Sequence, residues 1–182
     1  MPKYTSLAER LSKLSVEKPS RLSKTSPCHI WCGYTQKDGY VSKAEGYGRI
    51  NLPRDGRSCK FPTHRVAKVL EEINTLVMSF DFYNQKDRVL FFDLYDAYST
   101  VRLSIDHVCG NSLCINPDHL EWVYLSTNQQ RKKWSSTKRI LHFRFLAKQE
   151  TDHHKILQRS TSVRQFIRKI QQRYPLKKEK HH

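Results

Sequence analysis

The chain has 182 residues, a length that suits one compact domain with extensions. Lysine and arginine outnumber aspartate and glutamate by 33 to 17, and the excess lies at the ends: residues 129–182 hold sixteen basic and three acidic side chains, whereas residues 28–128 hold eleven and twelve. A near-neutral centre with basic ends is expected of a protein held on a polyanion, although a basic tail can also serve solubility alone.

Residues 1–27 are rich in Ser, Lys and Pro and are predicted to be a basic flexible arm, with at most one short helix near 7–14. Their charges are scattered and include no apolar leader, and no apolar run in the chain reaches the roughly 18 residues that span a bilayer. We therefore expect an intracellular protein with no membrane partner, in which the five cysteines are reduced.

Regular structure is expected to begin at Cys28, because the residues that follow have the glycines and aromatic side chains of a β-meander. Asp55-Gly56 can supply the positive φ angles of a tight turn. The sequence therefore predicts a hairpin with strands near 47–52 and 57–62.

A helix is expected after the hairpin, with Thr63 as its N-cap. Residues 74–98 are aromatic-rich but lack a clean period, so we interpret them as an insertion that packs against the core. Their aromatic side chains could instead stack on nucleic-acid bases, although such residues more often fill a core. The apolar stripe predicted for the helix comprises Val66, Val69, Leu70 and Ile73.

Residues 100–105 alternate as a strand, and this strand leads into a segment dense in histidine and cysteine, IDHVCGNSLCINPDHLEWVYLSTNQ. Ser126 and Gln129 then form a capping-box pattern. The pattern predicts a short helix that runs to about Trp134.

Cys109, Cys114 and His119 are each five residues apart, with glycine, asparagine and proline as turn formers between them. Three such ligands in a folded-back loop suit tetrahedral Zn²⁺, which needs a fourth ligand, and we assign Cys28 to that position. Simple burial is the alternative, but a loop rich in asparagine and glycine is a poor core builder, so metal binding is favoured. A zinc ion with four protein ligands is closed to chemistry and stabilises the fold.

His107 is then left outside the zinc shell, at a strand end two residues before the first loop ligand. A neutral imidazole near pH 7 can act as a general base toward water. Asn128, with Asp106 as a second candidate, offers an oxygen ligand that suits Mg²⁺. Each residue also has a structural interpretation, because a lone strand histidine is more often structural and Asn128 could satisfy backbone groups near a helix start.

The pattern D-H-x-C-x4-C-x-N-P-x-H-L over residues 106–120, followed by T-N, strongly resembles the HNH / His-Cys box (ββα-metal) homing endonucleases that carry a zinc-binding loop. CHIWCG at 28–33, GYGRI at 46–50 and HRV at 64–66 resemble further segments of that family in the same order. The resemblance implies an α+β fold: a ββα-metal nuclease core with a β-hairpin or meander, a structural zinc loop and an appended basic helical C-terminus.

Three parts of the chain are expected on this basis: the arm at 1–27, a zinc-stabilised nuclease domain at 28–134 and a basic C-terminal extension at 135–182. A second capping box opens an amphipathic helix over 162–174, whose apolar stripe needs a partner surface. Enzymes of the family commonly act as homodimers, so this helix is the expected subunit contact.

The resemblance implies an endonuclease that cuts double-stranded DNA with one catalytic Mg²⁺ and a structural Zn²⁺. His107 falls on the family's general base, Asn128 on its Mg²⁺ ligand, and Asp106 on a carboxylate that binds the metal in some members only. The family also uses a cation near the scissile phosphate, for which Lys60 or Arg57 lies closest and Arg49 is possible. The zinc ligands are Cys28, Cys109, Cys114 and His119, and the expected DNA contacts are Arg49, Arg54, Arg57, Lys60, Arg131, Lys132 and Lys133.

Two other functions fit parts of the sequence. A zinc-dependent DNA-binding protein that does not cut would keep the four zinc ligands but would need neither His107 nor Asn128, and the presence of both favours the enzyme. An RNA-binding module would use the aromatic residues of 74–98 for stacking. Cys32 and Cys59 have no assigned role and are expected to be buried thiols.

Overall fold

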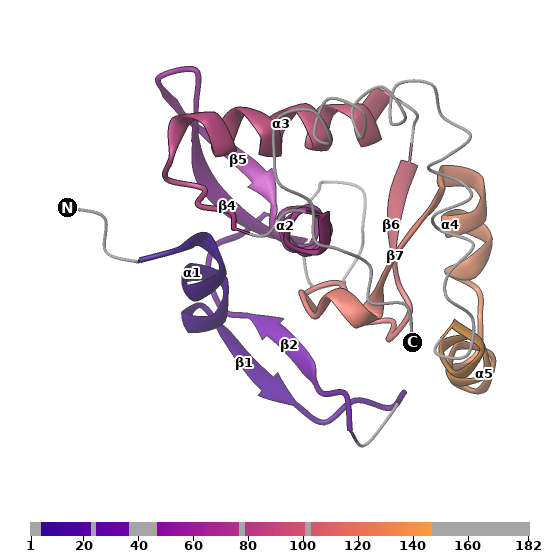
Figure 1. Ribbon diagram of the computed structural model, residues 1–182. Coiled ribbons are helices and arrows are strands. Elements are labelled where there is room, and N and C mark those ends of the chain that lie inside the picture. The colour runs from indigo at the N-terminus through magenta and orange to yellow at the C-terminus, as the bar shows by residue number, and fades with distance from the viewer. Residues whose placement is uncertain (1–4, 23–24, 37–46, 77–78, 101–102, 147–182) are drawn as a thin grey trace, which may run out of the picture.

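The computed structural model describes residues 5–22, 25–36, 47–76, 79–100 and 103–146 (Figure 1). Its elements in chain order are α1 Leu7–Lys13, β1 Ser15–Lys18, β2 Cys28–Trp31, β3 Thr35–Gln36, β4 Tyr47–Arg54, β5 Arg57–Pro62, α2 Thr63–Leu76, α3 Gln85–Thr100, β6 Leu103–His107, the 3-10 helix η1 Pro117–His119, β7 Leu120–Tyr124, α4 Leu125–Arg131 and α5 Ser136–Leu146. Small antiparallel sheets, β1–β2, β3–β4–β5 and β6–β7, are combined with helices, so the described fold is mixed α/β.

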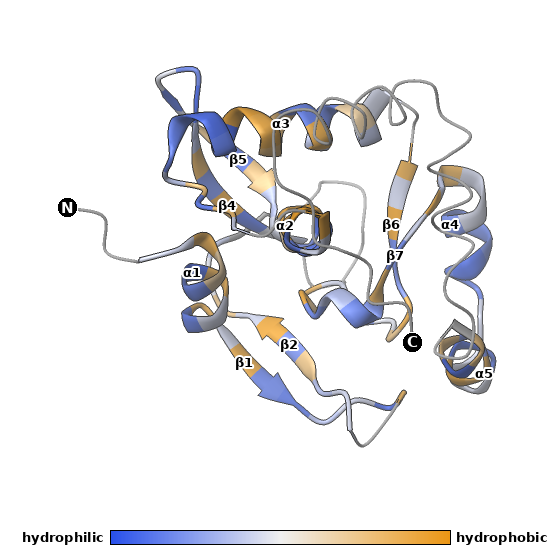
Figure 2. Cartoon of the chain, viewed as in Figure 1, coloured by the Kyte–Doolittle hydropathy of each residue, from blue (hydrophilic) through white to orange (hydrophobic). Residues whose placement is uncertain are grey.

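The predicted hairpin is confirmed in β4 and β5. Asp55 and Gly56 form its turn with φ angles of 51° and 73°, and the ladder runs from Arg54↔Arg57 at the turn to Arg49↔Pro62. Positive φ at both central residues matches the right-handed twist of the strands. Hydrophobic and hydrophilic residues alternate along β4 (Figure 2), so one face packs on the core and the other is left for other contacts.

α2 is the central helix and contacts α1, α3, β4, β5 and η1. The predicted stripe is confirmed, because Val66, Val69, Leu70 and Ile73 are all buried. The predicted cap is wrong: Thr63 is the first residue of the helix, and its buried Oγ1 has no hydrogen-bond partner within the described structure. β5 runs directly into α2, so the cap position falls on Pro62, whose side chain has no oxygen to accept a hydrogen bond.

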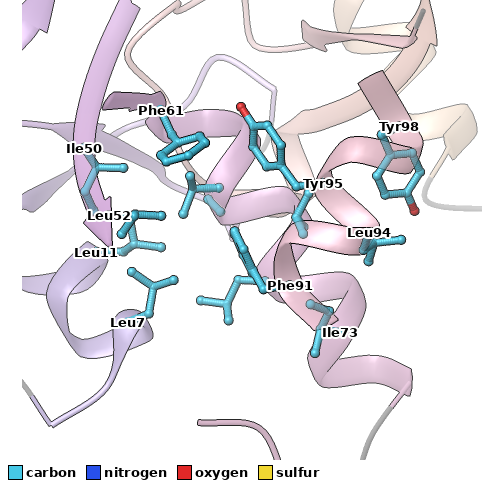
Figure 3. Close-up of a cluster of buried hydrophobic side chains, with 14 of the residues drawn as sticks. Leu7, Leu11, Ile50, Leu52, Phe61, Ile73, Phe91, Leu94, Tyr95 and Tyr98 are labelled. Atoms are coloured by element: carbon cyan, nitrogen blue, oxygen red, sulfur yellow. The ribbon is translucent and has the colours of Figure 1, made fainter. Parts of the chain in front are cut away.

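The aromatic-rich insertion packs against the core as expected, and most of its second half forms α3 (Figure 3). The helix was not predicted because its buried residues cover a broad face rather than a narrow stripe. The aromatic side chains that are enclosed cannot stack on bases, so within residues 74–98 only the half-buried Phe80 and Tyr83 are left for the RNA-binding interpretation. Buried residues of this region are Phe82, Leu90, Phe91, Phe92, Leu94, Tyr95 and Tyr98.

Folded structure begins before Cys28, so that expectation is wrong. α1 confirms the short helix near 7–14, but Leu7 and Leu11 are buried in the main core (Figure 3) rather than lying on a separate arm. β1 pairs with β2 from Ser15↔Trp31 to Lys18↔Cys28. Seven residues of amphipathic helix are too few to be stable alone, so α1 depends on this long-range burial.

β6, β7 and α4 follow one another as two antiparallel strands and a helix, with the histidine and cysteine segment between the strands. The strand predicted at 100–105 is present but shifted: β6 runs over Leu103–His107, and Thr100 is the last residue of α3. The capping box at Ser126 is wrong, because Tyr124 is the N-cap residue and no side chain caps the helix. The helix predicted at 162–174 lies outside the described residues. No helix in the described ranges is long and apolar enough to span a bilayer.

Replacing Leu7 by alanine is expected to lower the free energy of unfolding by about 2–5 kcal/mol, because the side chain is 1% exposed and leaves a cavity in the main core. Val16→Ala is the matched control in the same segment, since that side chain is 46% exposed, and it should cost less than about 1 kcal/mol. Urea titration of both variants with zinc present measures the difference. Equal stability of Leu7→Ala and the wild type would contradict the packing.

Candidate functional site

The four predicted zinc ligands lie together. One ligand atom from each of Cys28, Cys109, Cys114 and His119 falls within 4.8 Å of the others, although Cys28 comes from β2 and the remaining three from the segment between β6 and β7. Cys28, Cys114 and His119 are buried and Cys109 is half-buried. Three sulfurs and one imidazole at this spacing fit the four-coordinate sites that hold Zn²⁺ in proteins.

His119 is oriented for metal binding by its second ring nitrogen. Its Nδ1 lies 3.5 Å from Cys28 Sγ and 3.6 Å from Cys114 Sγ, while Nε2 lies 3.1 Å from Ser26 Oγ. Asn116 supports that shell by donating from Nδ2 to the carbonyl of Pro27 at 2.7 Å. Such outer partners fix the tautomer and angle of a metal-binding imidazole.

The backbone of the loop is also attached to β2. Trp31 N donates to the Leu113 carbonyl at 2.9 Å, and Ile115 N donates to the His29 carbonyl at 2.8 Å. Gly110, with φ of 75°, makes the turn after the first loop cysteine. The loop is therefore held to β2 on both sides of Cys114, which brings its thiol to Cys28.

The crowding of the thiols has an electrostatic consequence. Contact with Cys114, contact with Cys28 and burial raise the pKa of the Cys109 thiol. Three sulfurs so close together cannot all ionise unless a cation neutralises them, and bound Zn²⁺ supplies that charge. A site with four protein ligands leaves no open position, so its role is structural.

The two other cysteines lie outside the cluster. Cys59 is half-buried and packs against the main core. Cys32 is exposed, with its Sγ 3.4 Å from the Ile30 carbonyl, so the expectation of a buried thiol is wrong there. The reason is that Cys32 comes one residue after the end of β2, where the chain leaves the core.

His107 is the last residue of β6 and is not part of the cluster. It is 7% exposed, and its buried Nε2 has no hydrogen-bond partner among the described residues. Burial and then the Arg139 guanidinium lower the pKa of His107 to about 4, while a hydrogen bond to the backbone of Cys114 acts in the opposite direction. The ring is neutral at pH 7, and with Nδ1 assigned to the Cys114 backbone, the Nε2 lone pair is available to accept a proton.

Two further aromatic side chains adjoin His107 that the sequence reasoning missed. The ring centroid of His64 lies 4.8 Å from that of His107, and the Tyr47 centroid lies 6.0 Å from it. Burial, and then His107, lower the pKa of His64 well below its usual value. The available signal was the position of His64 in the first turn of α2, immediately after the hairpin that carries Tyr47.

Asn128 is anchored to β6 by its amide nitrogen. Nδ2 donates to Ser104 Oγ at 2.7 Å and to the Ile105 carbonyl at 3.0 Å. Within the described structure no hydrogen bond is made to Oδ1. The amide is anchored through its nitrogen to Ser104 and Ile105 of β6, the strand that ends at His107, and this leaves its oxygen available as a hard ligand.

Asp106 and Arg131 belong to an internal ion network. Asp106 Oδ2 lies 3.5 Å from Arg131 Nη1, and Asp106 Oδ1 lies 3.6 Å from Arg139 Nη1. Arg131 also pairs with Glu121 and is only 11% exposed. Adjacent strand residues face opposite ways, so Asp106 points away from His107. In this arrangement Asp106 does not face a metal ion beside His107, and Arg131 does not face an external phosphate.

The cations of the hairpin differ in their surroundings. Arg54 pairs with Asp96, with Nη1 and Oδ1 3.2 Å apart, and lies over the Phe92 ring. Lys60, the predicted catalytic cation, is exposed and lies 4.8 Å from the centroid of Tyr34. Arg49 is close enough to His64 to help lower its pKa. Arg57, Lys132 and Lys133 are exposed.

The fold and its site define a protein in which a closed Cys₃His metal loop adjoins a buried, neutral histidine. The model of one protein family, described as the zinc-binding loop region of homing endonuclease, matches residues 31–173. The chain therefore belongs to this family, and membership together with the Cys₃His cluster supports a structural zinc and nuclease activity. No curated protein and no solved structure matches the chain significantly.

We expect the purified chain to contain one zinc ion, and Cys28→Ala to lose it, because a distant strand supplies the fourth ligand. Cys32→Ala is the matched control: that cysteine lies four residues away, outside the cluster, and its removal should leave the zinc content unchanged. Metal analysis of dialysed protein makes the comparison. Full zinc content in Cys28→Ala would show that the ligand set is wrong.

Proposed function

We propose that this protein is a Mg²⁺-dependent endonuclease of the homing type that hydrolyses phosphodiester bonds in double-stranded DNA. The observation that carries the proposal is the state of His107: a neutral ring with an unpartnered Nε2, beside the Cys₃His cluster but outside it. The zinc site is complete with its four ligands and does not require His107. A buried imidazole nitrogen without a hydrogen-bond partner lowers stability unless a ligand or a water molecule bonds to it.

His107 acts as the general base. Its Nε2 takes a proton from a water placed behind the scissile phosphate, while the Cys114 backbone holds the ring in orientation. The hydroxide attacks phosphorus and the 3′ oxygen leaves and takes a proton from a solvent water, so the products carry 5′-phosphate and 3′-hydroxyl ends. Arg49, which acts on the neighbouring His64, adds positive charge beside this pair of histidines and favours approach of an anionic substrate.

Asn128 is the Mg²⁺ ligand in this proposal. Its Oδ1 is the oxygen donor left available beside β6, and the two hydrogen bonds of Nδ2 hold it there. Bound Mg²⁺ would neutralise charge on the scissile phosphate and on the departing oxygen. Asp106 is left out, since Arg131 and Arg139 neutralise its carboxylate.

The outer face of the hairpin is the proposed DNA-reading surface. Arg49 and Asn51 of β4 lie on one face with Lys60 of β5, which pairs with Asn51. A two-stranded ribbon of this kind fits the major groove, and long basic side chains on its face can reach phosphates and base edges. Lys132, Lys133 and Arg57 add exposed positive charge, so binding is expected to weaken steeply with salt.

The subunit arrangement is also a proposal. A homodimer on a near-palindromic site would give one active site per strand, and the segment at 162–174 is its proposed contact. Sedimentation of the full chain with and without a bound duplex determines the subunit count.

The function is tested on a duplex first selected for binding from a random-sequence library. With Mg²⁺, the wild type should cut it, and His107→Ala should cut about 10²–10⁴-fold more slowly while its dissociation constant stays within about threefold, because the ring acts on water and not on DNA affinity. His29→Ala is a matched control, since that histidine is half-exposed on β2, and it should cut at the wild-type rate.

Each alternative has its own outcome. A wild type that binds the selected duplex but leaves it intact with Mg²⁺ would favour the non-cutting DNA-binding protein. Equal cutting by His107→Ala and the wild type would exclude His107 as the base.

A further inference from the structure

Arg139 of α5 connects the two elements that carry the proposed catalytic side chains. Its Nη1 donates to the carbonyl of His107 at 2.9 Å, and its Nη2 donates to the carbonyl of Arg131 at 2.7 Å. His107 ends β6, and Arg131 ends α4, the helix that holds Asn128. A single guanidinium thus bonds to both the strand end and the helix end.

The geometry of the guanidinium suits this connection. Its donors form a rigid planar fork, so two bonds to two carbonyls fix the distance between those carbonyls, whereas a lysine ammonium would act as a single flexible point. The carbonyls are constrained in turn: that of His107 also accepts from Gly110 N at 2.7 Å, and that of Arg131 accepts from Trp134 N at 3.0 Å. Arg139 therefore completes a bonded frame around the zinc loop and the end of α4.

Charge and packing hold Arg139 in place. The side chain is 13% exposed and lies 3.6 Å from Asp106 Oδ1. It passes so close to the turn that a Cβ added at Gly110 would lie 3.7 Å from its Cδ. A second contact attaches the same helix, because His142 Nε2 lies 2.8 Å from Glu121 Oε2 on β7. Contacts therefore hold the aliphatic stem of Arg139, its guanidinium group and the helix that carries it.

We propose that Arg139 is a positioning residue, which holds His107 and Asn128 at the separation that the reaction requires. The proposal rests on the proposed nuclease function and deepens it. It also places α5 within the functional unit, since a domain ending at residue 134 would lack the arginine that joins β6 to α4. Errors of about 1 Å in such a separation cost about 100-fold in rate.

The test is single-turnover cutting of the selected duplex by zinc-loaded full-length Arg139→Ala. The rate constant should fall about 100-fold, with the dissociation constant for DNA within about threefold of the wild type, and added guanidinium ion should restore at least about tenfold of the loss where equimolar urea does not. Arg144→Ala is the matched control, an exposed arginine on the same helix, and it should cut at the wild-type rate.

Arg139→Lys keeps the charge and the stem, and it carries the test if the alanine variant does not retain zinc. It should fold, keep its zinc and still cut about tenfold or more slowly, because one ammonium cannot bond to both carbonyls in the same geometry. Wild-type cutting by either folded variant, or a loss confined to DNA affinity, would overturn the positioning role. If the wild type itself cuts no selected duplex, the proposed nuclease function is wrong. That outcome differs from a failure of the Arg139 assignment, in which the wild type does cut.

Discussion

The meeting of Cys28 with Cys109, Cys114 and His119 is the constraint on which the rest of the structure depends. The loop between β6 and β7 is rich in turn-forming residues and its helix η1 has only three residues, so its buried side chains Val108 and Ile115 need a further constraint to fix the course of the chain. One ligand from β2 and three from the loop convert two distant segments into one closed unit. The hydrogen bonds of Trp31 and Ile115 hold β2 and the loop together at the same junction.

That constraint explains the environment of His107. The ring lies two residues from the first loop ligand and is bonded to the backbone of the second, so the same loop that closes around the cation sets the orientation of the imidazole. Burial lowers its pKa, and the Arg139 guanidinium acts in the same direction, which keeps the ring neutral. The zinc ligands and the proposed base therefore have different chemical roles but are positioned by the same loop. Arg139 connects this region by hydrogen bonds to the helix that carries Asn128.

The features that could be predicted were those with a local physical signature. The Asp55-Gly56 turn, the stripe of α2 and the spacing of the zinc ligands each depend on neighbouring residues only. The rest depends on long-range packing: Leu7 and Leu11 are core residues only because the α1 segment returns to the centre, and Thr63 and Ser126 fail as caps because strands run directly into their helices. The pairing of Asp106 with Arg131 and Arg139 depends on how α4 and α5 dock, and no local pattern shows where a helix docks.

X-ray absorption at the zinc edge of the full chain tests the central claim most directly. The account predicts three sulfur ligands at about 2.3 Å and one nitrogen at about 2.0 Å, and the same spectrum from His107→Ala, because that imidazole lies outside the metal shell. Two sulfur and two nitrogen ligands, or a spectrum that changes when His107 is removed, would place this imidazole on the zinc. Either result would contradict the claim that the structural zinc site and the general base are separate.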